Sequence, residues 1–151
     1  MPRFFRRLNE GVFDIEDLKL RTHELADFME KSSKVYGFDL RSMISIGYSN
    51  GANIASSLLL LRPEVMSSAV LFRAMVPLIP EKVPNLTTKN IFMGAGKHDP
   101  IVPKEQTEML YRMYKKAGAK VLLHWEEDSG HELGYDEISA AKEWLANVPI
   151  K

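Results

Sequence analysis

Short apolar runs alternate with stretches of helical periodicity along most of the chain. Four runs predict buried strands, at residues 43–46, 68–72, 89–94 and 120–125. Around them, apolar residues recur at spacings of three and four, which predicts helices over residues 14–36, 52–61, 103–117 and 138–148. Strands that alternate with helices of this length favour an α/β fold of about four strands, with a parallel sheet and helices on both faces.

The first apolar run leads directly into Gly47, Ser49 and Gly51, and small residues then begin a helix. A Gly-x-Ser-x-Gly motif between a strand and a helix predicts a nucleophile elbow, a sharp turn that holds the serine hydroxyl above the sheet. We expect side chains at positions 47 and 51 to collide with neighbouring backbone, so that glycine is needed at both. The helix that follows would direct its amides and its dipole at the site. The alternative interpretation is a serine in an ordinary strand-to-helix turn.

Ser49, Asp99 and His131 each follow shortly after a predicted strand. Because the carboxyl ends of parallel strands meet at one edge of a sheet, we expect these residues to converge there. A serine hydroxyl needs a base to remove its proton, and an imidazole needs a carboxylate to fix its tautomer. We therefore predict a catalytic triad with Ser49 as nucleophile, His131 as base and Asp99 as orienting acid. The order Ser, Asp, His is the one that α/β-hydrolases use.

Other titratable residues compete for these roles. His98 adjoins Asp99 and is expected at the rim of the site, whereas His124 lies within a predicted strand and His23 lies on the first helix. Asp128 is the alternative orienting acid, although it shares a loop with the predicted base. A metal site is a further alternative, but no His-x-His or His-Glu-x-x-His spacing supports one. Its ligands would be His98, Asp99, His124 and His131.

Composition narrows the classes of function. The sequence has 20 Lys and Arg residues and 20 Asp and Glu residues. This charge balance does not indicate a surface that binds nucleic acid or a membrane. The absence of cysteine excludes disulfides, a thiolate nucleophile and a cysteine metal site. No signal-peptide core and no run of 18 apolar residues occur, so we expect a cytoplasmic protein. A chain of 151 residues, 45% of them apolar, is expected to form one domain, 1–151.

A basic cluster lies at the N-terminus, where Arg3, Arg6 and Arg7 are interleaved with Phe4 and Phe5. This cluster could bind an anion. We favour the other interpretation, an N-terminal turn that both aromatic side chains anchor and whose arginines are solvated.

We expect the substrate pocket to be of modest size and apolar. Its predicted lining is Tyr48, Arg73, Met75 and residues of the proline-rich loop 77–84. Arg73 either contacts a substrate anion or pairs with a surface carboxylate, and we favour the ion pair.

Three segments, Gly47–Asn53, Gly94–Pro103 and Ser129–His131, resemble the phospholipase/carboxylesterase branch of the α/β-hydrolases, within the dienelactone-hydrolase-like group. The first seven residues resemble the corresponding segment of bacterial predicted esterases, so the resemblance covers essentially the whole chain. It implies a serine hydrolase that cleaves small-molecule carboxylic esters through an acyl-enzyme, with no cofactor and no metal. Dienelactone hydrolases proper use a cysteine nucleophile, whereas Ser49 places this chain with the serine esterases.

Members of the family that this chain resembles begin with further strands and a His-Gly-rich loop, and this sequence lacks that region. That loop supplies one of two amides that hold the oxyanion, and the amide of Asn50 is the predicted donor here. Loss of one donor typically costs about 10² to 10³ in turnover. A truncated α/β-hydrolase fold of low activity, acting as an assembly or binding module, is therefore the alternative function.

The missing strands also affect the predicted sheet. Without a strand beside it, residues 43–46 would form an unpaired apolar edge, and we predict a homo-oligomer through this edge. The alternative is that Phe4, Phe5 and the first helix fold over it.

Overall fold

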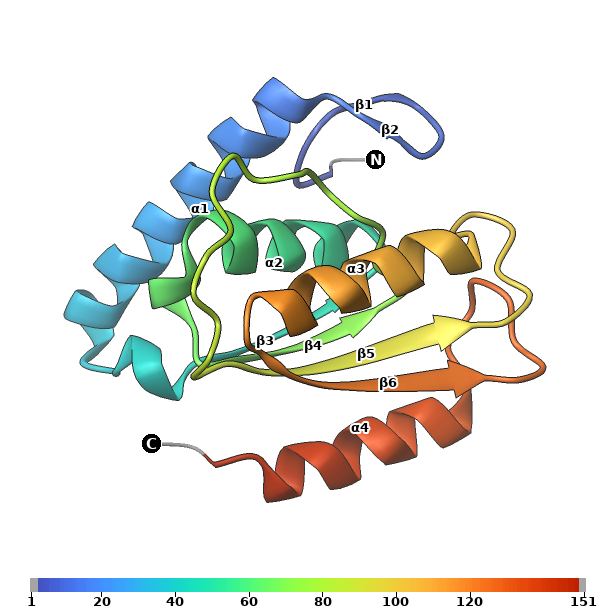
Figure 1. Cartoon of the computed structure of the whole chain (residues 1–151). Coiled ribbons are helices and arrows are strands. Elements are labelled where there is room, and N and C mark those ends of the chain that lie inside the picture. Colours follow the sequence, from blue (N-terminus) through green and yellow to red (C-terminus); the bar gives the residue numbers. More distant parts are fainter. Residues whose placement is uncertain (1–2, 150–151) are drawn as a thin grey trace.

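A computed structural model describes residues 3–149 of the chain. Its main sheet has four parallel strands in the order β3-β4-β5-β6 (Figure 1). These strands are β3 (Ile44–Tyr48), β4 (Ser68–Phe72), β5 (Asn90–Gly96) and β6 (Lys120–Glu126). The helices are α1 (Ile15–Tyr36), α2 (Asn50–Leu61), α3 (Lys104–Lys116) and α4 (Tyr135–Asn147). Helices α2 and α3 cover one face and α4 covers the other, which confirms the predicted architecture.

The register of the sheet places the functional loops at one edge. Tyr48 pairs with Phe72, Phe72 pairs with Gly94, and Gly94 pairs with His124, all in parallel. Each strand therefore delivers the loop that follows it to the same end of the sheet, where ligands bind in open α/β sheets.

Helix α2 is apolar on nearly all sides because it lies between α1 and the sheet (Figure 1). Its residues from Ala52 to Leu60 are all buried. Helix α1 packs on its outer side through Leu18, Ala26 and Met29, and a buried hydrogen bond of 2.6 Å joins the Thr22 and Ser57 hydroxyls. The larger hydrophobic core thus lies on the α2 and α3 side of the sheet.

The opposite face is covered only in part. Helix α4 packs on Val70, Phe72 and Phe92 through Ala141, and this forms a smaller apolar cluster. The register places Ile46 beside Val70, and Ile46 remains 64% exposed. The face of β3 on the α4 side is therefore open to solvent.

The N-terminal segment folds as a hairpin instead of the expected turn. It consists of β1 (Arg7–Asn9) and β2 (Val12–Phe13), which pair antiparallel. Phe5 is buried and its ring meets that of Phe13 edge-on, with centroids 5.1 Å apart, whereas Phe4 is 53% exposed. The prediction of two anchoring aromatic side chains is therefore wrong for Phe4, whose side chain lines the pocket surface, and the partner of Phe5 is Phe13.

Helix α1 begins with a side-chain cap at Asp14. The Asp14 carboxylate accepts a hydrogen bond of 3.1 Å from the Asp17 backbone N–H. This bond, together with the guanidinium of Arg6, lowers the pKa of Asp14 below its ordinary value. At the other end Gly37 adopts a left-handed conformation with φ 71°, and the helix stops where the sequence predicts. None of the helices within residues 3–149 has the length and apolarity needed to cross a membrane.

Candidate active site

Ser49 lies on a strained turn between β3 and α2, with φ 53° and ψ −113°. Its backbone N–H donates to the Phe72 carbonyl at 2.9 Å. A Cβ atom on Gly47 would lie 2.5 Å from the Gly51 carbonyl, so glycine is required at position 47. A Cβ atom on Gly51 would meet only the Phe4 ring, at 3.8 Å. The predicted collision at position 51 is therefore wrong, because the Cα–Cβ direction there points away from the strand.

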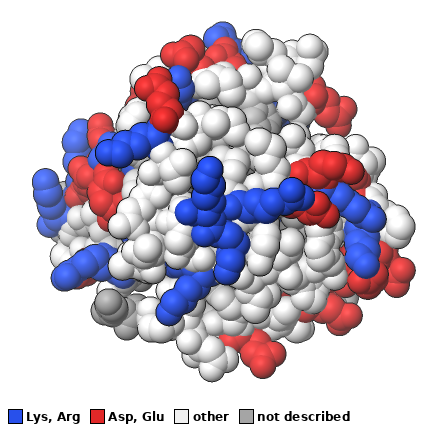
Figure 2. Space-filling model, viewed as in Figure 1, with Lys and Arg blue, Asp and Glu red and all other residues white. Residues whose placement is uncertain are grey.

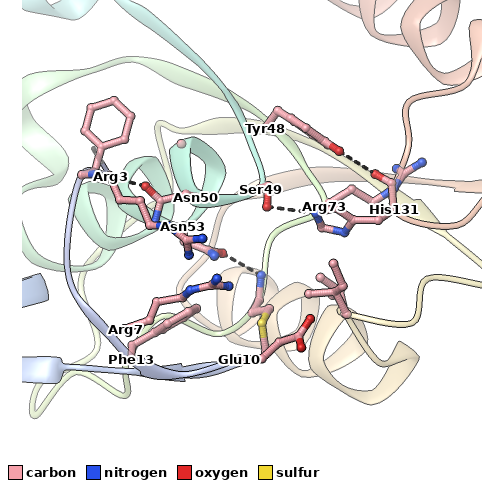
Figure 3. A pocket seen from close by; sticks show the side chains of 15 residues that line it. Arg3, Arg7, Glu10, Phe13, Tyr48, Ser49, Asn50, Asn53, Arg73 and His131 are labelled. Carbon is pink, nitrogen blue, oxygen red and sulfur yellow. Dashed lines mark hydrogen bonds between the residues drawn. The ribbon is translucent and has the colours of Figure 1, made fainter. Parts of the chain in front are cut away.

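The structure brings the predicted triad residues together. The Nε2 atom of His131 lies 2.9 Å from the Ser49 hydroxyl (Figure 3). The Nδ1 atom of His131 lies 2.8 Å from Oδ2 of Asp99. The Asp99 side chain is only 1% exposed. Its second oxygen accepts hydrogen bonds from the backbone N–H groups of Ile101 and Val102, at 2.8 and 2.9 Å. The carboxylate is therefore fixed on both oxygens, and the imidazole lies between it and the hydroxyl.

The competing residues lie elsewhere. His98, His23 and Asp128 are exposed, and His124 stacks on Phe92 with ring centroids 6.3 Å apart. Nδ1 of His131 contacts Asp99 and leaves no role for Asp128 as orienting acid. Within residues 3–149, no three His, Cys, Asp or Glu side chains are placed to share a metal ion.

Arg73 follows β4 in the left-handed region, with φ 58°, and is almost fully buried. Its Nη1 and Nη2 atoms donate to the two carboxylate oxygens of Glu137 at 2.6 and 2.7 Å. Glu137 is itself fully buried on α4. The predicted ion pair of Arg73 is therefore present. Its carboxylate lies in the interior of the protein, however, and not at the surface as predicted. The guanidinium donors point to protein groups, which argues against a substrate contact.

The same guanidinium holds the loop that carries the predicted base. Nε donates to the Gly130 carbonyl at 2.9 Å, and Nη2 donates to the Glu132 carbonyl and the Ser129 hydroxyl at 2.5 and 3.2 Å. A Cβ atom on Gly96 would overlap the Gly130 carbonyl, which shows how closely this loop packs on the end of β5. Glu132 accepts from the Gly130 N–H at 2.9 Å, and this bond is the main reason that the pKa of Glu132 is lowered.

Sequence reasoning missed Glu137. The available signal was a carboxylate four residues before Ala141 on the buried face of the closing helix. A charge at such a position requires a buried partner.

Ser49 and His131 open into a pocket of about 660 Å³. Tyr48, Arg73 and Met75 line it as predicted. Among the described residues the loop 77–84 does not contribute, because its Leu78 packs into the core. The N-terminal segment forms the wall instead (Figure 3). Its contributing residues are Arg3, Phe4, Arg7, Glu10 and Phe13.

Two further residues frame Ser49. The Tyr48 hydroxyl donates to the His131 carbonyl at 3.0 Å, which ties the elbow to the loop of His131. Asn50 is the first residue of α2, and the first four N–H groups of a helix have no carbonyl partner within it. Its side-chain oxygen accepts from the Phe4 N–H at 3.0 Å, so the N-terminal segment is held beside Ser49.

A parallel sheet with helices on both faces and a strained serine turn after a strand is the architecture of the α/β hydrolases. The chain belongs to the phospholipase/carboxylesterase family, whose sequence pattern matches residues 14–148. It is thus a carboxylesterase-type hydrolase of that family.

Individual relatives agree with this assignment. The chain is 45% identical over 150 residues to MhqD of Bacillus subtilis (strain 168), a proposed hydrolase, and the match covers 99% of this chain and 74% of MhqD. The crystal structure of a Bacillus cereus carboxylesterase is 46% identical, with a TM-score of 0.93 over 97% of this chain and 68% of that one. A structure of YahD with malic acid is 28% identical, with a TM-score of 0.88 over 97% of this chain and 73% of that one.

Proposed function

We propose that this chain hydrolyses carboxylic esters of small molecules through an acyl-enzyme, with Ser49 as nucleophile, His131 as general base and Asp99 as orienting acid. The observation that carries the proposal is the continuous hydrogen-bonded sequence from the Ser49 hydroxyl through both nitrogens of His131 to Asp99. Nucleophile, base and orienting group within hydrogen-bond reach of one another are the signature of an activated serine.

In the first half-reaction, the Ser49 oxygen forms a bond to the ester carbonyl carbon while its proton moves to Nε2 of His131. The tetrahedral intermediate then breaks its bond to the alcohol oxygen, which receives that proton and leaves. In the second half, His131 removes a proton from water, the water oxygen attacks the acyl carbon, and the bond to Ser49 breaks as the proton returns. Asp99 stabilises the imidazolium in both halves.

The amide of Asn50 is the proposed oxyanion donor, because it follows the nucleophile and begins α2. One oxyanion donor is typically worth about 10² to 10³ in turnover. The reaction requires no cofactor, since the triad supplies nucleophile, base and acid.

Small esters fit the pocket best. Its walls combine apolar side chains, among them Phe4, Phe13 and Met75, with the reacting Ser49 and His131 at one side. YahD, which shares the fold, is seen with malic acid, so a small carboxylic acid is a precedent for the size of ligand we propose here.

The test of an acyl-enzyme is pre-steady-state hydrolysis of 4-nitrophenyl acetate. We expect a burst of nitrophenolate close to one equivalent per chain, and an intact mass raised by one acetyl group that peptide mapping places on Ser49. The matched control is His23→Gln, because His23 is an exposed histidine remote from the site. An acetyl group on any other residue, or an unchanged burst in His131→Gln, would contradict the mechanism.

We also propose that two copies of the chain associate through the free edge of β3. Among residues 3–149 this strand ends the sheet without a further strand on its outer side, and its Ile46 is 64% exposed, a combination that recruits a further strand. Sedimentation at high micromolar concentration should show a mass that rises toward that of a dimer, and Ile46→Lys should keep the chain monomeric. Leu122→Lys on the opposite edge strand, where Leu122 is 45% exposed, should leave association unchanged. A monomer at every concentration would contradict the proposal.

A further inference from the structure

Two arginines of the pocket have no acidic partner. Every other arginine in the chain forms an ion pair with a carboxylate: Arg6, Arg21, Arg41, Arg62, Arg73 and Arg112. Over the face shown in Figure 2, some basic side chains lie beside acidic ones, whereas others gather near the centre of the view. On α3, Arg112 pairs with Glu108 at 2.8 Å. Among the described residues, Arg3 and Arg7 have no carboxylate within ion-pair distance, and both line the pocket that contains Ser49.

Both guanidinium groups reach into this pocket. Figure 3 shows the side chains of Arg3 and Arg7 extending from the N-terminal segment toward the space beside Ser49. The segment is held in place, because the Phe4 N–H donates to the Asn50 side chain at 3.0 Å and Phe5 is buried against Phe13. The two cations are therefore presented to the pocket by an anchored N-terminal segment.

The other charges of the pocket do not cancel them. The buried carboxylates of Glu137 and Asp99 both lie within ion-pair distance of Arg73, at 2.6 and 3.9 Å, and Asp99 is also hydrogen-bonded to His131. Glu10 also lines the pocket, but its carboxylate lies beyond ion-pair distance of both guanidinium groups. Two unpaired cations against one exposed carboxylate leave the pocket attractive to an anion.

Between these cations and Ser49 the lining is largely apolar. Phe4, Phe13, Met75, Ile101 and Val102 all contribute to it. A ligand that matches both the two arginines and the apolar lining has an aliphatic chain with an ester at one end and a carboxylate at the other. The planar fork of a guanidinium matches a carboxylate with two parallel hydrogen bonds.

We propose that Arg3 and Arg7 form a carboxylate subsite, and that the preferred substrates are half-esters of aliphatic dicarboxylic acids. This inference rests on the proposed esterase function. The free carboxylate binds the arginines and takes no part in the chemistry. At the other end the Ser49 oxygen forms its bond to the ester carbonyl carbon, the bond to the alcohol oxygen breaks, and water then releases the dicarboxylic acid.

The test compares two esters of equal chain length, the 4-nitrophenyl half-ester of adipic acid and 4-nitrophenyl hexanoate. We expect kcat/KM to be several-fold higher for the half-ester. Arg7→Gln or Arg3→Gln should lower kcat/KM for the half-ester about threefold to fivefold, and the double variant should lower it about tenfold. In each variant kcat/KM for the hexanoate should change less than twofold. Glu10→Gln, which removes the opposing charge, should raise kcat/KM for the half-ester. Arg112→Gln on α3 should leave kcat/KM unchanged for both esters.

The outcomes separate this inference from the esterase proposal. Equal hydrolysis of the two esters, or loss of hexanoate activity together with half-ester activity in Arg7→Gln, overturns the carboxylate subsite while leaving the esterase intact. If neither ester is hydrolysed, calorimetric titration with the adipate dianion decides the question. Binding that the double variant weakens about tenfold supports the subsite, and absent or unchanged binding overturns it. Raising the salt concentration from about 0.05 M to about 0.5 M should lower kcat/KM for the half-ester and leave kcat/KM for the hexanoate unchanged.

Discussion

Replacing Ser49 with alanine is expected to lower kcat for 4-nitrophenyl butyrate by at least about 10³-fold. The alanine removes the only protein atom that the proposed mechanism joins to the acyl group. His131 and Asp99 would remain hydrogen-bonded to each other, but without a nucleophile they can only assist water. The measurement is steady-state hydrolysis at matched protein concentrations.

The fold of this variant should be unchanged. Serine and alanine bear similar strain at φ 53°, and the backbone bonds of the turn do not use the hydroxyl. Circular dichroism and thermal unfolding should therefore match those of the natural chain. Equal hydrolysis rates for both proteins would mean that ester cleavage does not depend on Ser49, and the acyl-enzyme proposal would be wrong.

Replacing Arg73 with methionine should have the second largest effect, because it acts on both stability and activity. It leaves the fully buried carboxylate of Glu137 without its cation, and breaking a buried ion pair costs about 3–5 kcal/mol of unfolding free energy. It also removes the donors to Ser129, Gly130 and Glu132 that hold the loop of His131. We expect a lower denaturation midpoint in urea and a fall in kcat of about 10²-fold, since small displacements of a catalytic group have effects of this size.

A paired variant separates the two contributions. In Arg73→Met with Glu137→Leu both charges are removed, and apolar replacement of a buried pair is often close to neutral for stability. We expect this variant to recover most of the unfolding free energy while kcat stays low and KM changes little, because the loop still lacks its guanidinium. Recovery of kcat together with stability would show that Arg73 acts only through the fold.

The fold and the convergence of the three predicted triad residues were accessible from the sequence because their signals are local. Apolar runs mark the buried strands, and Ser49, Asp99 and His131 each follow one of them, so the parallel topology alone brings them to one edge. The elbow was equally accessible, since Gly47 is required by the close approach of Gly51.

The rest depends on contacts between segments far apart in the chain. Nothing near Arg73 reveals that its partner is Glu137, 64 residues away on α4. The sequence predicts that residues of the loop 77–84 belong to the pocket lining, but Leu78 packs into the core. The hairpin of residues 7–13 forms the wall in its place, and its position is set by Phe5 against Phe13 and by Phe4 beside Asn50.

The central claim is that His131 and Asp99 activate the Ser49 hydroxyl. A fluorophosphonate probe tests it most directly, because such a probe reacts with activated serines without any knowledge of the substrate. The account predicts that mass spectrometry of the labelled natural chain finds the phosphonyl group on Ser49 alone, and that His131→Gln is labelled far more slowly. An unlabelled natural chain, or labelling at the same rate without the imidazole, would contradict it.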